Sequence, residues 1–349
     1  MEKISQQHIK WENTRAVFAA VAEAGTISRA ELAARTGLSL MTIGKLVDAL
    51  DACEVVTQEK DERILAGRTA RLVACRPAWH MLVLDLTAKN FRMTVLDLSC
   101  KIVEEIIYPY DDNLFCEENL VLFLKNLPIY QMHQTNPAYC IGAGILLPGT
   151  YDAEHDRMLG AHLPLHVPLQ PRNTLAPLLP APKLTILSDV QAAAISASLG
   201  GDGANNLLWM SLERPISGAL VLNNKPLLGA RGCGGRFGEI TVGTNFTLGE
   251  AMLTLTDPTE RGVAVAIALY TLISALDPAV IRLEARTPIF DQTFLDALHG
   301  RLAQLNADRA LPLPTIIAEV RDVCTPVLGI ASAMREAWLH GRLDSLSRK

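Results

Sequence analysis

The chain has 349 residues, 49% of them hydrophobic and 20% charged, so it is long enough for two or three well-buried domains and does not have a disordered composition. Its net charge of −5 excludes a general polyanion binder, and any contact with DNA must come from a local, shaped surface. The longest apolar stretch, residues 262–276, is shorter than the ~20 residues of a membrane span and predicts a buried helix. We therefore expect a cytoplasmic protein without a membrane segment.

Residues 1–76 are expected to form short helices followed by a hairpin. A first helix ends at Gly25, and Ser28 and Glu31 have the spacing of a capping box, in which each side chain binds the other residue's backbone amide. Gly37 can supply the left-handed conformation of a tight turn, and Ser39 caps a third helix. The buried face of that helix is predicted from its apolar spacing: Ile43, Leu46, Val47 and Leu50.

Two helices joined by a glycine-containing turn match the helix-turn-helix pattern, in which the second helix presents its N-terminal side chains to the DNA major groove. Strand candidates at 55–57 and 70–73 flank a charged tip and would form a wing, where Gly67 lets Arg68 approach a narrow minor groove. The alternative is a three-helix module that binds another protein. Predicted DNA contacts lie on the two helices and the wing: Arg29, Arg35, Ser39, Thr42, Lys45, Arg63 and Arg68.

From residue 80 onward, strands and helices follow one another in mixed order, which is typical of α/β domains. Strands are expected at 82–86, 91–98, 101–108, 139–147, 184–187, 207–212, 219–222, 280–283 and 315–320. Helices are expected at 117–127, 189–199, 261–276 and 327–340. The proline-rich residues 163–182 are interpreted as a loop.

The seven cysteines are scattered without a CxxC pair, which indicates buried thiols in a reduced compartment rather than a disulfide framework. His162 and His166 have the i, i+4 spacing of some metal ligands, but Pro164 between them disfavours the helix that this spacing requires. No metal site is therefore expected.

The sequence resembles the ROK family, which contains sugar kinases and sugar-responsive repressors, and the resemblance covers nearly the whole chain. In the N-terminal half, the segments that resemble the DNA-binding head of the repressor branch are 13–15, 28–33, 36–39 and 67–68. The resemblance implies an α/β protein with an N-terminal winged helix-turn-helix at 1–76. Residues 80–349 would form a two-lobed actin-like or hexokinase-like (ribonuclease H-like) ROK domain that acts as a sensor.

The segments that hold phosphate and nucleotide in family kinases are altered in this chain. Asp85 is kept, but the glycine-rich turn expected after it is replaced by Leu86-Thr87. The second phosphate loop corresponds to residues 213–217, where a glutamate would repel phosphate and a proline removes an amide donor. Glu284-Ala285 replaces a pair of glycines near the nucleotide. We therefore expect neither kinase activity nor a cofactor.

The sugar site of the family is altered too. Its Asn-Asp pair corresponds to Ser188-Asp189, and Asp189 stands at the position of the general base, which is vestigial here; alternatively, Asp189 is only a helix N-cap. Arg236 replaces the sugar-binding Glu, Glu239 replaces the zinc-associated His, and the zinc loop is missing. Arg236 and Glu239 would form an internal ion pair or bind a ligand more acidic than a hexose. The candidate effector-binding residues are Ser188, Asp189, Arg236 and Glu239, with no catalytic residue and no metal.

Together these observations predict a homodimeric repressor of carbohydrate-metabolism genes that binds a double-stranded operator and a small-molecule effector, a sugar or sugar derivative. Closure of the two sensor lobes would move the linker at 75–80 and change the spacing of the two heads. Three alternatives stay open: a DNA-binding protein that still phosphorylates a sugar, a regulator controlled by a protein partner, and a scaffold that does not bind DNA.

Overall fold

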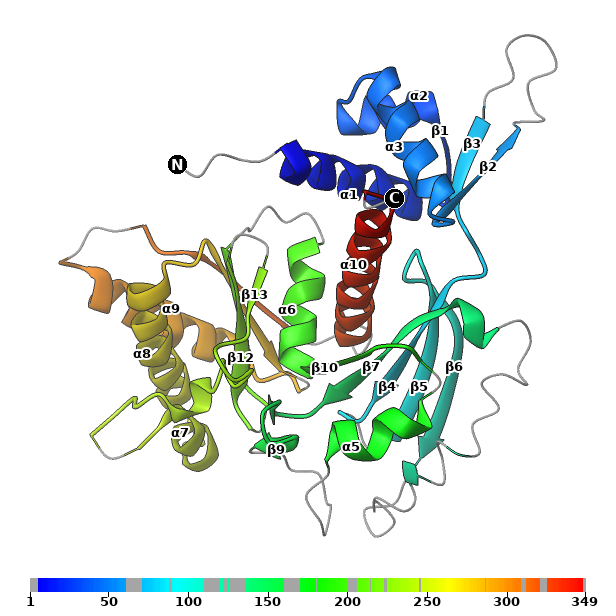
Figure 1. Cartoon of the computed structure of the whole chain (residues 1–349). Coiled ribbons are helices and arrows are strands. Elements are labelled where there is room, and N and C mark those ends of the chain that lie inside the picture. The colour runs from blue at the N-terminus through cyan, green and yellow to red at the C-terminus, as the bar shows by residue number, and fades with distance from the viewer. Residues whose placement is uncertain are drawn as a thin grey trace.

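The computed structural model describes residues 6–60, 71–87, 90–109, 120–121, 125, 136–159, 170–179, 181–199, 206–213, 215–222, 225–244, 246–285, 287–308, 312–320 and 325–347. Within these ranges the chain forms an N-terminal group of three helices with a small sheet, followed by two five-stranded sheets with helices around them (Figure 1). Two helices, α6 (Asp189–Leu199) and α10 (Thr325–Ser347), lie between the two large sheets.

The N-terminal group, which we call the head, consists of α1 (Gln6–Ala24), α2 (Arg29–Thr36) and α3 (Leu40–Ala52). Its sheet is antiparallel and has the order β1 (Thr26–Ser28), β3 (Arg71–Cys75) and β2 (Val56–Lys60). The predicted helices and hairpin strands are confirmed, with strand ends shifted by up to three residues. The strand β1 was not predicted, because three residues between two helices carry no readable periodicity.

Local signals in the sequence set the ends of the head helices. Ser28 Oγ accepts from the Glu31 amide at 3.2 Å and the Ser28 amide donates to Glu31 Oε2 at 2.9 Å, so the capping box is confirmed. Gly37 ends α2 with φ 69°, and Ser39 Oγ accepts from the Thr42 amide at 3.2 Å. The predicted buried face of α3 is also confirmed, with Ile43, Leu46, Val47 and Leu50 all in the core.

The first large sheet has the order β10-β7-β4-β5-β6. The strands β10, β7 and β4 are parallel to one another, whereas β4, β5 and β6 form an antiparallel meander. Their bounds are β4 (His80–Asp85), β5 (Asn90–Asp97), β6 (Ile102–Pro109), β7 (Cys140–Leu147) and β10 (Leu184–Ser188). The inner strand β7 is buried along its whole length, because helices or loops cover both faces of the sheet.

The second large sheet has the order β13-β12-β11-β14-β15, in which β11, β14 and β15 are parallel. Its strands are β11 (Asn206–Ser211), β12 (Ser217–Leu222), β13 (Lys225–Leu227), β14 (Val280–Ala285) and β15 (Thr315–Val320). Its helices are α7 (Leu248–Thr254), α8 (Pro258–Leu276) and α9 (Gln292–Asn306). The predicted strands of both large sheets are confirmed in position.

Among the described residues, α8 is the one helix long and apolar enough to cross a membrane. Its residues Val265 and Leu269 are wholly buried in the core that it shares with the second sheet. A side chain at Gly262 would meet the Phe294 carbonyl oxygen at 2.5 Å, so glycine there lets α8 pack closely on α9. The predicted buried helix is therefore confirmed, and it forms part of the core around the second large sheet.

Residues 163–182 are not entirely a loop, as the sequence analysis expected. They contain α5 (Pro171–Leu175), followed by a short 3-10 turn. Pro171 stands at a helix start, where its missing amide costs nothing, and Asp156 accepts from the Arg172 and Asn173 amides at 2.9 Å. The expectation failed because the capping carboxylate comes from a distant segment.

Other elements complete the fold. The hairpin of β8 (Thr150–Asp152) and β9 (Arg157–Leu159) follows β7, and neither it nor β13, α7 and α9 was predicted. Three short 3-10 helices occur at Pro137–Tyr139, Ala176–Leu178 and Phe237–Glu239. The predicted helix at 117–127 lies mostly outside the described residues.

The head and the first large sheet share one hydrophobic core through α10. Its buried residues come from all three head helices, from β4, β5 and β7, and from α10. Trp79, between β3 and β4, is buried there, and its Nε1–H donates to the Glu54 carbonyl at 2.7 Å. Its ring packs against Trp338 of α10 at a centroid distance of 5.0 Å. The segment that joins the head to the first large sheet is therefore anchored on both sides.

Candidate DNA-binding and ligand-binding sites

The outer face of α3 is a candidate DNA-contacting surface. Ser39 Oγ and Thr42 Oγ1 lie 2.9 Å apart and are hydrogen-bonded at the start of the helix. Lys45, one turn further along, is exposed and forms no ion pair with the residues that the structure describes. Leu40 and Met41 are exposed in the same first turn, which the sequence analysis did not notice. Both residues lie outside the buried face of α3, and this position in the sequence could have predicted their exposure.

The two predicted arginines of α2 are already bound within the head. Arg29 Nη2 lies 2.5 Å from both Asp48 Oδ1 and Gln58 Oε1, so it joins α2 to α3 and β2. Arg35 pairs with Glu23 of α1 at 2.9 Å. The contacts of Arg29 brace the head. The Arg35–Glu23 pair is exposed, and such pairs contribute about 0–1 kcal/mol to the free energy of folding. The predicted contacts Arg63 and Arg68 lie outside the described residues.

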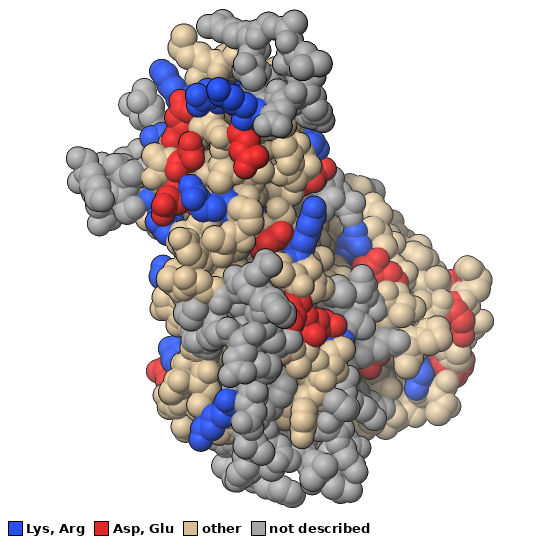
Figure 2. Space-filling view, turned by 90° about the vertical axis from the view of Figure 1, so that its right-hand side faces the viewer, with Lys and Arg blue, Asp and Glu red and all other residues tan. Residues whose placement is uncertain are grey.

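Charge on the head is mixed rather than uniformly basic. Figure 2 shows Lys and Arg side chains interspersed with Asp and Glu side chains on one face of the head. A mixed surface does not attract the DNA backbone over long distances. Binding to DNA would therefore have to come from contacts at a few positions, as the net charge of the chain already indicated.

The first sheet brings two acidic residues toward one another at the carboxyl ends of its parallel strands. Asp85 ends β4 and is almost fully buried, and Asp189 follows β10 and is also buried. Burial raises the pKa of the Asp85 carboxyl; hydrogen bonds from Thr87 and the charge of Arg92 lower it in part, and the negative charge of Asp189 raises it further. Ligands of open parallel sheets bind at this edge.

Thr87 replaces the glycine turn after β4 with a side-chain contact. Its amide and its hydroxyl donate to Asp85 Oδ1 at 2.8 and 2.7 Å. These two bonds occupy one oxygen of the Asp85 carboxylate. The local geometry therefore fixes Asp85 within its own turn.

Ser188, rather than Asp189, caps α6. Ser188 Oγ accepts from the Gln191 amide at 3.2 Å and the Ser188 amide donates to Gln191 Oε1 at 3.1 Å, which is a complete capping box. Asp189 occupies the first helical position, and its Oδ1 accepts from the Val190 amide at 2.9 Å. The alternative in which Asp189 serves only as the N-cap is therefore wrong. The spacing from Ser188 to Gln191 was a readable signal for this cap.

The glycine-rich segment 229–239 packs against the start of β12 and reaches α6. Gly235 has φ 98°, and a side chain there would lie 1.8 Å from the Gly218 carbonyl oxygen, so only glycine fits. Gln191 Nε2 donates to the Gly232 carbonyl at 3.3 Å. The structure thus brings the glycine-rich segment to the helix start that carries Ser188 and Asp189, as the resemblance implied.

Arg236 and Glu239 form an ion pair, but the pair is not internal. Arg236 Nη2 contacts Glu239 Oε1, while the two side chains are 50% and 61% exposed. The expectation of an internal pair is wrong because Phe237 between them fills the buried position against Gly218. The pair lies on the surface of the segment that reaches α6.

The second large sheet carries acidic residues at the positions where the resemblance to family kinases implied a nucleotide site. Glu284 is completely buried at the end of β14, and its backbone carbonyl accepts from the Leu212 amide at 2.9 Å. Glu213 follows β11 at the same edge of the sheet and is partly exposed. The partly exposed Glu213 carboxylate at this edge opposes the approach of a phosphate chain.

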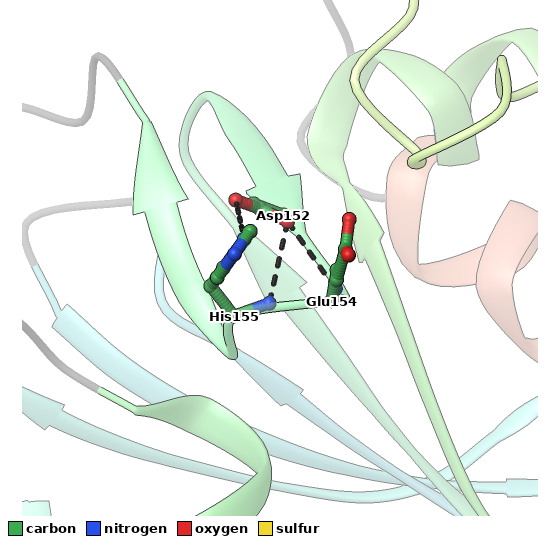
Figure 3. A group of neighbouring side chains, drawn as sticks. All are labelled: Asp152, Glu154 and His155. Atoms are coloured by element: carbon green, nitrogen blue, oxygen red, sulfur yellow. Dashed lines mark hydrogen bonds and ion pairs between the residues drawn. The ribbon is translucent and has the colours of Figure 1, made fainter.

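Asp152, Glu154 and His155 are the one group of possible metal ligands among the described residues, with their ligand atoms within 4.8 Å of one another (Figure 3). Asp152 Oδ2 is already bound by His155 Nδ1 at 2.8 Å and by Arg157 Nε at 3.1 Å. Its other oxygen accepts from the Glu154 and His155 amides, which closes the β8–β9 turn. A cation would have to displace Arg157, so we interpret this cluster as a structural turn. His162 and His166 lie outside the described residues.

The chain is similar to known proteins in sequence and in fold. No family model matches the chain. The xylose repressor of Bacillus subtilis is 22% identical over 259 residues, which cover 70% of this chain and 64% of the repressor. The DNA-binding transcriptional dual regulator NagC of Escherichia coli is 20% identical over 239 residues, or 67% of this chain and 58% of NagC. The matched segments thus span less than two thirds of either relative.

Solved structures agree over a longer part of the chain. A ROK family transcriptional regulator, a homologue of the E. coli MLC protein, superposes with a TM-score of 0.71 at 15% identity, covering 96% of this chain and 99% of that one. The ROK hexokinase of Thermus thermophilus has a TM-score of 0.57 at 18% identity, with 73% and 97% covered. The fold is therefore the α/β fold of ROK proteins, and the resemblance of this chain to the ROK family is confirmed.

Proposed function

We propose that this protein is a DNA-binding transcription repressor of carbohydrate-metabolism genes whose affinity for its operator is controlled by a sugar or sugar derivative. The observation that carries the proposal is the exposed outer face of α3, on a three-helix head that is fused to a ROK fold. The matched relatives support it, since one is named a xylose repressor and the other a DNA-binding transcriptional dual regulator. We further propose a cytoplasmic homodimer, which would present two heads to a palindromic operator.

In this proposal residues 1–76 act as a winged helix-turn-helix. The helices α2 and α3 are joined by three residues that include Gly37, and α3 would enter the major groove. The strands β2 and β3 extend away from the helices in Figure 1 and would form the base of the wing. The chain from residue 80 onward would act as the sensor.

The contacts of the head refine the set of DNA-binding residues. We retain Lys45, Thr42 and Ser39 on the open face of α3, where Lys45 can bind a phosphate or a guanine edge. Arg35 also stays, because a DNA phosphate can compete with an exposed carboxylate for its guanidinium. We reassign Arg29 to a bracing role, since Asp48 and Gln58 already hold it. Arg63 and Arg68 remain predictions for the wing.

We propose that the effector binds at the edge of the first sheet where Asp85, Ser188 and Asp189 lie. Carboxylate oxygens accept hydrogen bonds from hydroxyl groups, so two of them favour a neutral polyol over an anion. Arg236 and Glu239 would stand at the rim of this site. Because the pair is exposed and mutually neutralised, it gives no net preference for an acidic ligand.

A route from this site to the head runs through the pair α6 and α10. The first turn of α6 carries Ser188 and Asp189, and α6 packs on α10 where Gly329 meets the Ala192 carbonyl. At the other end of α10, Arg342 stacks over Trp79 at 4.5 Å and His340 packs against Trp11 of α1. Lobe closure would thus act on the head through α10 as well as through the linker at 75–80.

The proposal is tested by measuring binding of the purified full chain to DNA from upstream of its own gene, by fluorescence anisotropy at fixed salt. We expect sequence-specific binding that weakens when one neutral sugar is titrated in. A chain that binds no fragment would contradict the proposal and favour a scaffold. Specific binding that no sugar alters, while a protein captured from cell extract alters it, would favour control by a protein partner.

Lys45→Ala is expected to weaken operator binding about fivefold, because one phosphate or base contact is lost, and to reduce the salt dependence of log K by about one ion. The measurement is anisotropy at several salt concentrations. Lys183→Ala, which removes the same charge from the exposed surface of the sensor, serves as the control and should change neither quantity. Equal binding by the Lys45 variant and the wild type would remove Lys45 from the contact set.

We also expect no ATP-dependent phosphorylation of any hexose, since Glu213 opposes phosphate at the edge of the second sheet and Glu284-Ala285 replaces the glycine pair expected near the nucleotide. A coupled assay for ADP release over a panel of hexoses measures this. The retained Asp189 keeps a sugar kinase as the second candidate function, because its carboxylate is the base that such a kinase needs. ADP release that depends on both sugar and Asp189 would establish that alternative.

A further inference from the structure

Two large apolar side chains are exposed where α3 begins. Leu40 is 62% exposed and Met41 is 74% exposed, which makes Met41 the most exposed large hydrophobic side chain of the described residues. Single exposed apolar residues are ordinary, but two adjacent ones form a small patch at the end of a helix that is otherwise well packed. The core does not use them, because the buried stripe of α3 begins at Ile43.

The face that follows this patch is open and positively charged. Lys45 stands one turn after Met41, and the two side chains share a face because i and i+4 residues are neighbours on a helix. Gly44 lies between them, and a side chain added there would meet only Arg29 Nη1, at 3.5 Å, within 4 Å. Glycine costs helix stability, yet nothing in the packing of α3 requires it. An absent side chain on an exposed face lets another molecule approach the backbone closely.

The neighbouring charges decide which partner fits the patch. Asp48, the acidic residue further along this face, is already bound by Arg29, so the open charge beside the patch is that of Lys45. An apolar surface next to a free cation suits a partner that offers methyl groups beside phosphate. In the major groove of duplex DNA, the C5-methyl group of thymine is the apolar group displayed beside the base edges.

We propose that Leu40 and Met41 read thymine, by packing on the C5-methyl groups of one operator half-site while Gly44 lets the helix backbone approach the groove. The inference rests on the proposed function of the head as a DNA-binding unit. It adds the chemistry of the sequence preference: each half-site carries at least one thymine opposite the first turn of α3. Lys45 then supplies affinity, and the apolar pair supplies discrimination.

The test compares operator duplexes that contain thymine with duplexes in which deoxyuridine replaces it and removes only the methyl group. The wild-type chain is expected to bind the deoxyuridine duplex roughly fourfold more weakly for each methyl group that it reads. Met41→Ala should bind the thymine duplex more weakly and discriminate less between the two duplexes. Met41→Leu should restore most of both, because it keeps an apolar side chain of similar volume.

Two further variants separate reading from folding. Gly44→Ala should raise the unfolding temperature while lowering DNA affinity, because its methyl group improves helix propensity but occupies the open face. Leu253→Ala, at an exposed site of the second lobe, should change neither property.

Equal binding of the two duplexes by the wild type, or unchanged discrimination by Met41→Ala, would overturn the inference but leave the DNA-binding proposal intact. A shift in oligomeric state of Met41→Ala with unaltered DNA affinity would assign the patch to a protein contact and overturn it as well. If the wild type binds no DNA fragment, both proposals fall together.

Discussion

Gly329→Ala is expected to lower the free energy of unfolding by about 3 kcal/mol. A Cβ atom at this position of α10 would lie 1.7 Å from the Ala192 carbonyl oxygen and 2.6 Å from its carbonyl carbon. Both atoms belong to the backbone of α6, so no side-chain rotation relieves the clash, and the two helices must move apart. The cost is large because α6 and α10 are both part of the packed layer between the sheets. Denaturation by urea, followed by circular dichroism, measures the change.

The chain offers a matched control on the same helix. A side chain at Gly341, also in α10, would meet nothing within 4 Å, so Gly341→Ala should stabilise the protein by about 0.5–1 kcal/mol through helix propensity alone. The two substitutions add the same methyl group to the same helix, yet their effects should have opposite signs. Destabilisation by both would show that α10 tolerates no added volume at either end, and would contradict the contact with Ala192 as the cause.

The elements that the sequence could predict are those specified by neighbouring residues. The capping box at Ser28, the left-handed Gly37 and the buried stripe of α3 all depend on residues within one or two turns of each other. The same holds for inner strands such as β4 and β7, whose residues are buried along the whole strand because both faces are covered. The cap of α6 had such a local signal too, the Ser188–Gln191 spacing, and it was missed.

Contacts between segments that are distant in the sequence could not be predicted from neighbouring residues. Nothing near Arg29 in the sequence indicates its partners, because only the fold brings Asp48 and Gln58 to it, 19 and 29 residues away. The helix α5 depends on Asp156, which lies in the preceding hairpin. The surface position of the Arg236–Glu239 pair follows from Phe237, which takes the buried place between them. In the first two cases a partner remote in sequence decides what the residue does, and in the third the remote contact is that of Phe237 with Gly218.

The candidate ligand site shows the same division. Asp189 was found because a helix start after a strand is a local pattern, whereas its nearness to Asp85 depends on the order β10-β7-β4 of the sheet. The contribution of Gln191, which binds both the helix start and the glycine-rich segment, needed the fold. The apolar residues in the first turn of α3 can be seen in the sequence. Their interpretation as a contact surface depends on the fold, in which nothing in the described chain covers them.

Trp79→Ala is expected to cost about 3–5 kcal/mol and to loosen the head from the sensor. The indole lies in the short segment between β3 and β4 and contacts both sides: its Nε1–H binds the Glu54 carbonyl, and its ring packs against Tyr139 and Trp338. Arg342 covers the ring from α10. Removing the side chain leaves a cavity in the core that the head shares with the first large sheet. The amide hydrogens of the head should therefore exchange faster than the amide hydrogens of the two large sheets.

Trp79→Phe separates the packing of the ring from its hydrogen bond. It keeps most of the apolar contact and loses only the bond to Glu54, so it should cost about 1–2 kcal/mol and leave hydrogen exchange of α1, α2 and α3 nearly unchanged. Lobe movements would reach the head through this anchored junction. In that case Trp79→Ala should still bind DNA at low temperature, but the effector should change its DNA affinity less than in the wild type. Trp79→Phe should keep both its DNA binding and its response to the effector. A full effector response in Trp79→Ala would mean that α1 and α10 couple the head to the sensor without the junction, through contacts such as Arg15–Glu336.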